Sequence, residues 1–249
     1  MELFGQTRSF LGRDHALIES ASFVMAPLPN WDKTQGIILI TPRMGARFQQ
    51  YLAIMEPGGI AGPTLPGIER FVYVLEGSLN VRLAGDERTL VAGSFVYTPA
   101  GEVLSLRATA LSRLCVFEKR YTPRSGILLP RRVIGRQQDI EGVPFQGDPD
   151  AQLQNLLPDE PGYDMAVNIF RFQPGAALPL VEMHVMEHGL LMLQGQGVYR
   201  LSDRWYPVRQ GDVIWMSPFC PQWFVAMGKE PAAYLYYKDV NRDPAETAS

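Results

Sequence analysis

The sequence predicts an all-β protein made of two similar β-sandwich or β-barrel domains. Twenty prolines and 23 glycines are spread along its 249 residues, which favours short strands and turns over long helices. Both halves contain short apolar runs rich in Val, Leu, Tyr and Phe that are broken by Gly, Asp or Pro. Strands that recur about every 8–12 residues, with turn residues between them, are typical of sandwiches and barrels.

The chain also aligns with itself, which indicates a duplication. Three pairs of segments match in order: residues 68–77 with 186–195, 93–97 with 211–215, and 55–58 with 172–175. The first two pairs are offset by 118 positions and the third by 117. One such match could arise by chance, but three in order at a nearly constant spacing are better explained by two copies of one fold.

The expected domain boundaries follow from this duplication. We expect residues 1–123 to comprise an N-terminal extension and the first barrel, and residues 156–249 to form the second barrel with a short C-terminal tail. Residues 124–155 are rich in Arg, Pro and Gly and are expected to connect the two. The extension, over residues 1–40, is expected to dock on the barrels as strands.

Composition limits the classes of partner. Hydrophobic residues make up 46% of the chain, charged residues 20%, and the formal net charge is −3, which gives no reason to expect nucleic acid or an acidic membrane as a partner. The N-terminal segment lacks the apolar stretch of a secretory signal, and no apolar run reaches the roughly 20 residues that span a bilayer. Cys115 and Cys220 are too few for a disulfide framework. We therefore expect a cytoplasmic protein that acts on a small molecule, and a homo-oligomer that covers exposed barrel edges.

The densest chemical signal is Glu182-x-His184-x₃-His188, which places two of the three histidines and a carboxylate within seven residues. On a β-strand, side chains two and six positions apart point to the same face, so these three groups could converge. Neutral imidazoles and an ionised carboxylate form a ligand set for a divalent metal. Burying such groups costs free energy unless something satisfies them, and a metal would do so.

The same residues also spell a His-x-x-Glu-His peptidase motif through Glu187. That motif needs a helix, in which positions four apart share a face. The glycines and prolines around it, and the strand-like residues 72–75 at the equivalent place in the first copy, argue against a helix. We therefore favour the strand and expect Glu187 to lie off the metal-facing side.

The spacing of these residues from Gly195 resembles the first motif of the cupin family, which are small jelly-roll barrels that hold a metal. The usual order of ligands, His, His and Glu, is permuted here. The second cupin motif places a ligand eleven residues after its glycine, and counting from Gly211 gives Gln222. The resemblance therefore implies four metal ligands in the second copy: Glu182, His184, His188 and Gln222. It also implies the fold, a bicupin with two jelly-roll barrels in tandem.

The first copy keeps the frame of the two motifs and loses their ligands. Gly93, Pro99 and Gly101 match the second motif. The ligand positions hold side chains that do not form a divalent site: Thr64, Pro66, Arg70 and Leu104. We expect a metal-free first barrel, in which Glu69 and Arg70 form a buried ion pair where the second barrel holds its metal.

Longer matches resemble one family of cupins, the (S)-ureidoglycine aminohydrolases. They include residues 182–188, 195–199, 221–223 and 237–243 in the second copy, and residues 41–45 and 67–77 in the first. The resemblance covers nearly the whole chain. It implies a manganese-dependent hydrolase that releases ammonia from (S)-ureidoglycine and leaves (S)-ureidoglycolate during purine degradation, after allantoate is opened.

The resemblance also supports Tyr199, Tyr234 and Lys238 as substrate-binding residues. On the last strand, alternation places Lys238 on the same face as Tyr234 and Tyr236. Lys238 is expected to pair with the substrate carboxylate, and Glu182 is a candidate for moving protons if one of its oxygens is free of metal. Glu182 and Lys238 are thus the expected catalytic residues.

Two alternatives remain open on the sequence alone. Two imidazoles, a carboxylate and an amide oxygen suit Mn²⁺ or Fe²⁺ better than Zn²⁺, and these donors do not separate the first two metals; the family resemblance favours Mn²⁺. An Fe-dependent bicupin dioxygenase would use the same barrel and similar ligands. A non-catalytic cupin would bind a small ligand without turning it over.

Overall fold

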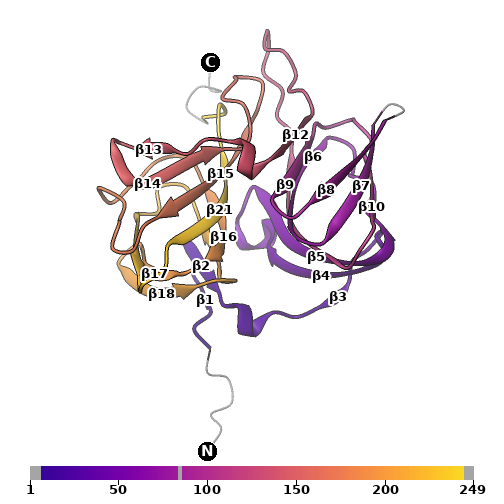
Figure 1. The fold of residues 1–249 in the computed structure, drawn as a ribbon. Helices are drawn as coiled ribbons and strands as arrows, with labels where there is room; N and C mark the ends of the chain where they lie inside the picture. The colour runs from indigo at the N-terminus through magenta and orange to yellow at the C-terminus, as the bar shows by residue number, and fades with distance from the viewer. Residues whose placement is uncertain (1–6, 84–85, 244–249) are drawn as a thin grey trace, which may run out of the picture. The chain divides into compact units, whose positions relative to one another are not determined.

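The structure, a computed structural model, describes residues 7–83 and 86–243. Over these residues it consists of β-strands and short 3₁₀ turns, with no α-helix, which confirms the all-β prediction (Figure 1). The chain forms two compact units. The N-terminal barrel holds the described residues of Val24–Ile140 and Leu156–Asp164, and the C-terminal barrel holds those of Met1–Phe23, Glu141–Asn155 and Met165–Ser249.

The N-terminal barrel is a curled antiparallel sheet of ten strands. These are β3 (Ala26–Pro27), β4 (Asp32–Ile40), β5 (Phe48–Ile60), β6 (Ile68–Glu76), β7 (Ser78–Leu83), β8 (Asp86–Val91), β9 (Ser94–Thr98), β10 (Ser105–Ala108), β11 (Ser112–Arg120) and β12 (Val133–Arg136), with 3₁₀ turns η2 (Pro42–Met44) and η3 (Gln137–Asp139). Their order is β12-β9-β6-β11-β5-β10-β7-β8, and β4 pairs with both β5 and β3. Alternate residues of neighbouring strands, such as Val72 and Val116, meet in register and form an aliphatic core.

The C-terminal barrel combines two sheets. The larger one contains β1 (Phe10–Leu11), β2 (His15–Ile18), β13 (Val143–Phe145), β14 (Asp148–Asn155), β15 (Met165–Phe172), β16 (His188–Gln194), β19 (Val213–Met216) and β21 (Ala232–Asp239), in the order β1-β2-β19-β16-β21-β15-β14-β13. The smaller one has the order β18 (Arg204–Arg209), β17 (Gln196–Leu201), β20 (Gln222–Met227), and η1 covers Ser20–Ser22. Its core includes a group of aromatic rings, in which Phe172 packs edge-on against Phe224.

The two units differ from the expected boundaries because the strand ahead of each copy pairs with the other copy. In the C-terminal barrel, β2 adds to the edge of β19, with Leu17 opposite Ile214. In the N-terminal barrel, β12 adds to the edge of β9, with Ile134 opposite Val96. Residues 141–155, expected as a connection, form β13 and β14 of the C-terminal barrel. Each added strand satisfies backbone groups that an open sheet edge would leave unpaired.

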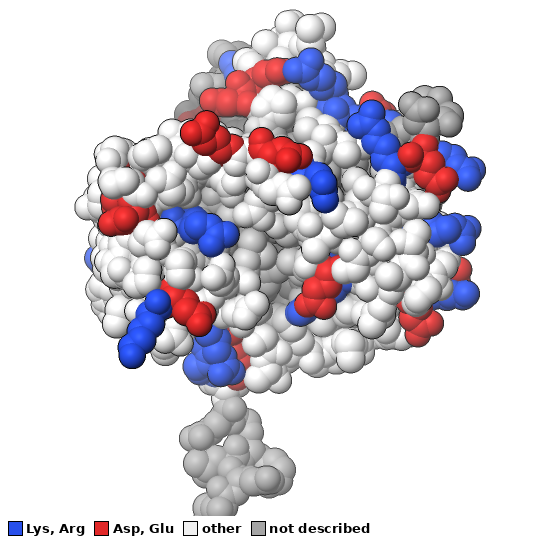
Figure 2. All heavy atoms as spheres, in the orientation of Figure 1, with Lys and Arg blue, Asp and Glu red and all other residues white. Residues whose placement is uncertain are grey.

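Charged side chains of both signs are interspersed on the face shown in Figure 2. Neither sign gathers into a broad patch on that face, in keeping with a formal net charge of only −3. Within the described chain, no helix has the length and apolar character needed to cross a membrane.

The turn between β16 and β17 explains why the first motif ends in a glycine. Gly195 has a φ of +71°, and a Cβ there would meet the Pro231 carbonyl oxygen at 2.5 Å. We predict that Gly195→Ala destabilises the protein by about 2–4 kcal/mol, because a left-handed backbone strain adds to a backbone clash. Gly175→Ala is the matched control, since Gly175 has a φ of +87° and nothing within 4 Å of its added Cβ. Denaturant unfolding gives the loss of unfolding free energy in each variant, and the difference between the two losses measures the cost of the clash. Equal losses would contradict a clash at Gly195.

The expected ion pair between Glu69 and Arg70 is wrong. The two residues are neighbours on β6, so their side chains point to opposite faces of the sheet. Arg70 Nε instead donates to Glu118 Oε1 at 2.6 Å, from the strand opposite. Glu69 is fully buried on the other face, where it accepts a hydrogen bond from the Tyr97 hydroxyl.

The environment of Glu69 predicts a pH-dependent stability. Burial, and then the neighbouring Asp164 carboxylate, raise the pKa of Glu69 well above its ordinary value of 4.5. The folded state therefore holds this proton more tightly than the unfolded state. The contribution of protonated Glu69 to stability is complete below about pH 4.5. This contribution is lost as the pH rises through the folded-state pKa of Glu69.

We predict that Glu69→Gln removes this loss, because glutamine keeps an oxygen for Tyr97 and does not titrate. Relative to the unmodified protein, the variant should gain unfolding free energy as pH rises above about 4.5. Glu76→Gln, on the exposed end of the same strand, is the control and should show no such gain. The measurement is urea unfolding at several pH values. If the free energy of unfolding changes with pH in the same way in all three proteins, the effect of Glu69 is ruled out.

Candidate active site

All seven predicted site residues of the second copy line one cavity of about 130 Å³ in the C-terminal barrel. They are Glu182, His184, His188, Tyr199, Gln222, Tyr234 and Lys238. The structure therefore brings together residues that are up to 56 positions apart in sequence. A cavity this small suits a compact substrate.

Strand alternation is not what brings the first three residues together, and this part of the prediction is wrong. Only His188 lies on a strand, as the first residue of β16. Glu182 forms an isolated bridge with Gln222, through backbone hydrogen bonds of 2.8 and 2.9 Å, and His184 lies in the loop that follows. The Phe219 N–H donates to the His184 carbonyl at 2.7 Å and fixes this loop. Because the segment is not helical, the peptidase interpretation also fails.

Three nitrogen-bearing side chains meet at the centre of the site. His184 Nε2 lies 3.3 Å from His188 Nε2 and 3.0 Å from Gln222 Nε2. Burial, followed by the proximity of His184 and Lys238, lowers the pKa of His188 to about 3. Burial also lowers the pKa of His184. Both imidazoles are therefore neutral at pH 7, which is the form that binds metals.

The orientation of His188 also fits a metal. Its Nδ1 lies 3.3 Å from the Tyr237 carbonyl oxygen, which can only accept a hydrogen bond. The ring proton is therefore on Nδ1, and the lone pair of Nε2 points toward His184. Rotating the Gln222 amide by half a turn exchanges its nitrogen for its oxygen, so this side chain can also present an electron pair.

Glu182 stands slightly apart from this group. Within the described chain it belongs to no trio of His, Cys or carboxylate ligand atoms that lie within 4.8 Å of one another. Burial raises the pKa of Glu182, and the nearby Lys238 ammonium partly offsets this. A rotation of its side chain is needed for its carboxylate to join the two imidazoles. A carboxyl group with a raised pKa is also suited to exchanging protons with a bound molecule.

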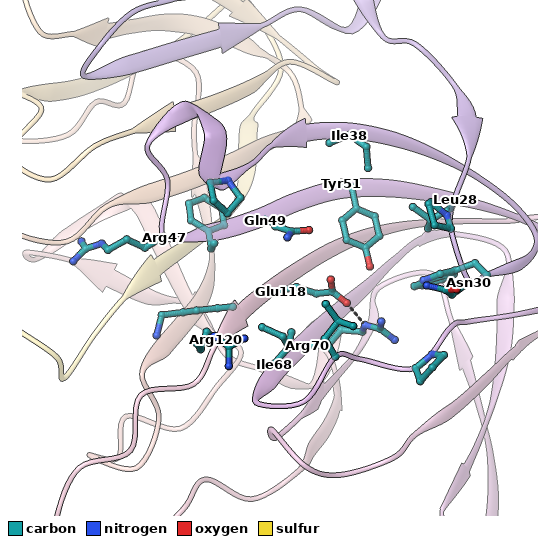
Figure 3. A pocket seen from close by; sticks show the side chains of 17 residues that line it. Leu28, Asn30, Ile38, Arg47, Gln49, Tyr51, Ile68, Arg70, Glu118 and Arg120 are labelled. Atoms are coloured by element: carbon teal, nitrogen blue, oxygen red, sulfur yellow. Dashed lines mark hydrogen bonds and ion pairs between the residues drawn. The ribbon is translucent and has the colours of Figure 1, made fainter.

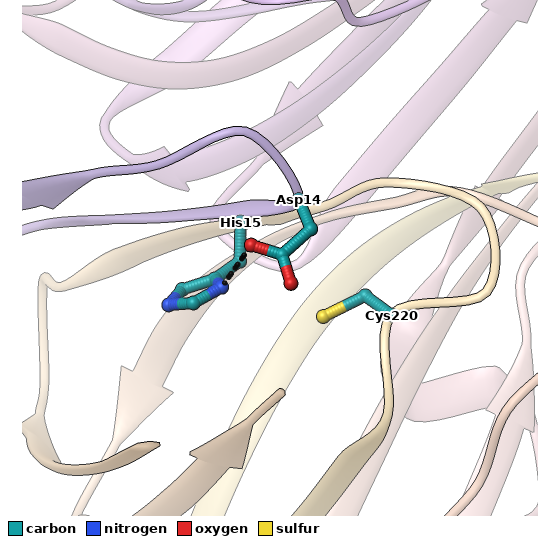
Figure 4. Close-up of side chains that lie close together, drawn as sticks. All are labelled: Asp14, His15 and Cys220. Atoms are coloured by element: carbon teal, nitrogen blue, oxygen red, sulfur yellow. Dashed lines mark hydrogen bonds and ion pairs between the residues drawn. The ribbon is translucent and has the colours of Figure 1, made fainter. Parts of the chain in front are cut away.

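A different trio of potential ligands does lie within 4.8 Å, formed by Asp14, His15 and Cys220 (Figure 4). Both nitrogens of His15 are already engaged, with Asp14 Oδ1 at 2.9 Å and the Tyr206 hydroxyl at 2.8 Å. Burial raises the pKa of the Cys220 thiol to about 11, so this group is protonated at pH 7 and is a poor ligand. The hydrogen bonds of His15 to Asp14 and Tyr206 instead tie β2 to β18 of the smaller sheet.

The far wall of the cavity comes from the last strand. Lys238 lies directly opposite His188 in the β16–β21 register. As alternation predicts, Tyr234, Tyr236 and Lys238 all face the cavity. Burial raises the pKa of Tyr199 and of Tyr234, so both phenols stay neutral and can donate hydrogen bonds.

Sequence reasoning missed part of the wall. Phe145 and Leu153, from β13 and β14, line the cavity, and Phe145 packs edge-on against Phe170 with ring centroids 4.8 Å apart. No motif marks these residues, because they come from the segment interpreted as a connection. Asn168 donates to the Tyr236 hydroxyl at 3.2 Å and orients that ring.

The whole chain is similar to known proteins of one family. The model of the cupin domain matches residues 51–117 and 168–237, one stretch in each barrel. An Oryza sativa protein named as a probable (S)-ureidoglycine aminohydrolase is 44% identical over 98% of this chain and 78% of its own length. The (S)-ureidoglycine aminohydrolase of Arabidopsis thaliana is 42% identical over 98% and 81%, respectively.

A solved structure shows the same architecture. The crystal structure of protein Ylba from Escherichia coli superposes with a TM-score of 0.83 at 32% identity and covers 95% of this chain and 96% of that one. The match to the cupin domain and the similarity to these relatives over nearly the full length point to the same family. The chain belongs to the (S)-ureidoglycine aminohydrolase family of cupin proteins.

Proposed function

We propose that this chain is an (S)-ureidoglycine aminohydrolase, which releases ammonia from (S)-ureidoglycine and leaves (S)-ureidoglycolate in purine degradation. The identity to relatives of that name supports this activity. The observation that carries it is the convergence of His184, His188 and Gln222 beside Lys238 in one small cavity. This arrangement offers neutral donors for a cation and a positive charge for an anionic substrate.

The proposed cofactor is Mn²⁺, held by His184, His188, Gln222 and a rotated Glu182. Such a set of nitrogen and oxygen donors suits Mn²⁺ or Fe²⁺, and Mn²⁺ is the choice that the family resemblance favours. When bound, a divalent cation acts as a Lewis acid and orients the substrate. The neutral state of both imidazoles supports the assignment, because no proton has to leave them before they bind.

Lys238 is proposed to bind the carboxylate of the substrate. Its place opposite His188 puts a positive charge next to the residues that would hold the cation, where it would attract an anionic group of the substrate. The phenols of Tyr199 and Tyr234 are proposed to donate hydrogen bonds to the ureido oxygen. Three fixed contacts around one carbon present a single face of it to water, which is the requirement for a stereospecific product.

Glu182 is proposed to move the protons. As the bond between the central carbon and the amine breaks, the Glu182 oxygen that is free of metal relays the ureido N–H proton to the leaving nitrogen, which departs as ammonia. A double bond then joins the central carbon to the ureido nitrogen. In the second half, water adds its oxygen to that carbon while Glu182 relays a proton from the water to the ureido nitrogen. The raised pKa of Glu182 supports both the acid and the base role.

The test is a coupled assay, because ureidoglycine is unstable. Allantoate and its amidohydrolase generate the substrate, and release of the second ammonia is followed with and without the purified chain and Mn²⁺. The chain should accelerate this release, and His184→Ala should abolish the acceleration. If the unmodified protein gives no acceleration with Mn²⁺, the proposed function is wrong.

A further inference from the structure

The N-terminal barrel contains a cavity of about 480 Å³, larger than the candidate active site of the other barrel (Figure 3). Arg70 forms part of the wall of this cavity. The offset of 118 positions between the two copies matches Arg70 to His188. A fixed guanidinium thus stands where the C-terminal barrel presents a metal-binding imidazole. Arg70 is only 6% exposed, and burying such a charge is costly unless polar partners surround it.

The buried end of the cavity presents hydrogen-bond donors and acceptors side by side. Arg70 donates from Nε to Glu118 at 2.6 Å and from Nη1 to the Gly62 carbonyl at 2.7 Å, and its guanidinium lies over the Trp31 ring at 5.1 Å. A guanidinium carries five N–H groups, so donors remain after these two bonds. Glu118 accepts through Oε1, and its carboxylate has further acceptor positions. The Tyr51 hydroxyl points to the same pair (Figure 3).

An adjacent donor and acceptor are the complement of an amide or urea edge. Such an edge presents one carbonyl oxygen and one N–H group next to each other. The carbonyl would accept from Arg70 and the N–H would donate to Glu118. Trp31 and Tyr51 add flat walls against which a planar group can stack.

The open end of the cavity is cationic. The side chains of Arg47 and Arg120 lie at the end away from Asn30 in Figure 3, and both are exposed. Arg120 Nη1 makes a 3.4 Å hydrogen bond to the Pro66 carbonyl, and no described carboxylate lies within ion-pair distance of it. Ile68 lies between the two ends. Arginine is the residue best suited to bind a carboxylate through two parallel hydrogen bonds.

We propose that this cavity binds a small carboxylic acid that carries a urea or carboxamide group. The carboxylate is held by Arg120 with Arg47, and the planar amide edge is held by Arg70 and Glu118. This site is separate from the one in the C-terminal barrel. It does not depend on the proposed function, because its recognition rests on residues of the N-terminal barrel alone.

The probe is N-carbamoylglycine, a stable acid with a urea group, titrated calorimetrically into the full chain carrying His188→Ala. Adding Lys238→Met to that background also removes the proposed carboxylate partner of the C-terminal site, so binding that persists with both changes reports on the N-terminal cavity. We expect one molecule to bind per chain. Adding Arg120→Ala should weaken binding about tenfold or more, through the loss of a charge-assisted bond. Arg88→Ala, an exposed arginine on β8 outside the cavity, should leave it unchanged.

Pentanoate separates the two halves of the proposal, since it has a carboxylate and no urea. It should bind at least tenfold more weakly than N-carbamoylglycine in the same background. Equal affinity for the two acids would overturn the role given to Arg70 and Glu118. Loss of all N-carbamoylglycine binding on His188→Ala, or full binding after Arg120→Ala, would overturn the site itself. None of these three results bears on ammonia release by the unmodified protein, so the failures of the two proposals are distinguishable.

Discussion

Replacing His188 by alanine is expected to abolish metal binding and to lower the rate of ammonia release by about three orders of magnitude. A Lewis-acid metal supplies several kcal/mol of transition-state stabilisation, and each 1.36 kcal/mol is a factor of ten. His188 is a proposed ligand that the fold holds firmly, because it opens β16, is 5% exposed and has its ring proton held by the Tyr237 carbonyl. Its loss would leave the proposed site with a single imidazole, that of His184. Metal content after dialysis and the thermal shift on adding Mn²⁺ measure the effect directly.

His15→Asn is the informative control for this experiment. It alters the other cluster of potential ligands, Asp14, His15 and Cys220, and leaves the proposed site intact. We expect it to keep both the bound metal and the thermal shift, at some cost in stability from the lost hydrogen bond to Tyr206. If the protein loses its metal on His15→Asn and keeps it on His188→Ala, the cation is bound by the cluster of Asp14, His15 and Cys220, and the proposed site is wrong.

The residues that line the candidate site could be predicted from sequence because their positions depend on spacing from glycines. Gly195 and Gly211 have φ values of +71° and +89°, so each marks a turn that other residues form only under strain. Counting from these two turns identifies His188 and Gln222 without knowledge of the path between them. The path itself was predicted incorrectly, since His184 reaches the centre from a loop and not from a strand.

Other features could not be predicted because they depend on which strands pair. The periodicity of residues 15–18 indicates a strand and does not say which sheet it joins. The same holds for β13 and β14, whose side chains Phe145 and Leu153 complete the cavity wall. The partner of Arg70 is a further example, because Glu118 lies 48 positions away and only the β6–β11 register brings the two together.

Replacing Lys238 by methionine is expected to lower kcat/KM by about 100-fold while the metal stays bound. Methionine keeps much of the length and apolar volume of lysine and removes the charge. Leaving one partner of a buried charged pair without the other costs about 2–5 kcal/mol. The loss of kcat/KM should appear mainly in KM, because the substrate carboxylate does not change during the reaction. Lys229→Met, at an exposed position of the same barrel, is the matched control and should behave like the unmodified protein.

The metal readout separates a substrate-binding role from a structural one. The Lys238 ammonium contributes to lowering the pKa of His188, so its removal brings that pKa closer to its ordinary value. Because burial is the larger cause, His188 stays neutral at pH 7, and Lys238→Met should bind Mn²⁺ at least as well as the unmodified protein, since a repelling charge is gone. Loss of both metal and activity would mean that Lys238 supports the fold of the site. Retained metal with a raised KM is the outcome that places its ammonium against the substrate carboxylate.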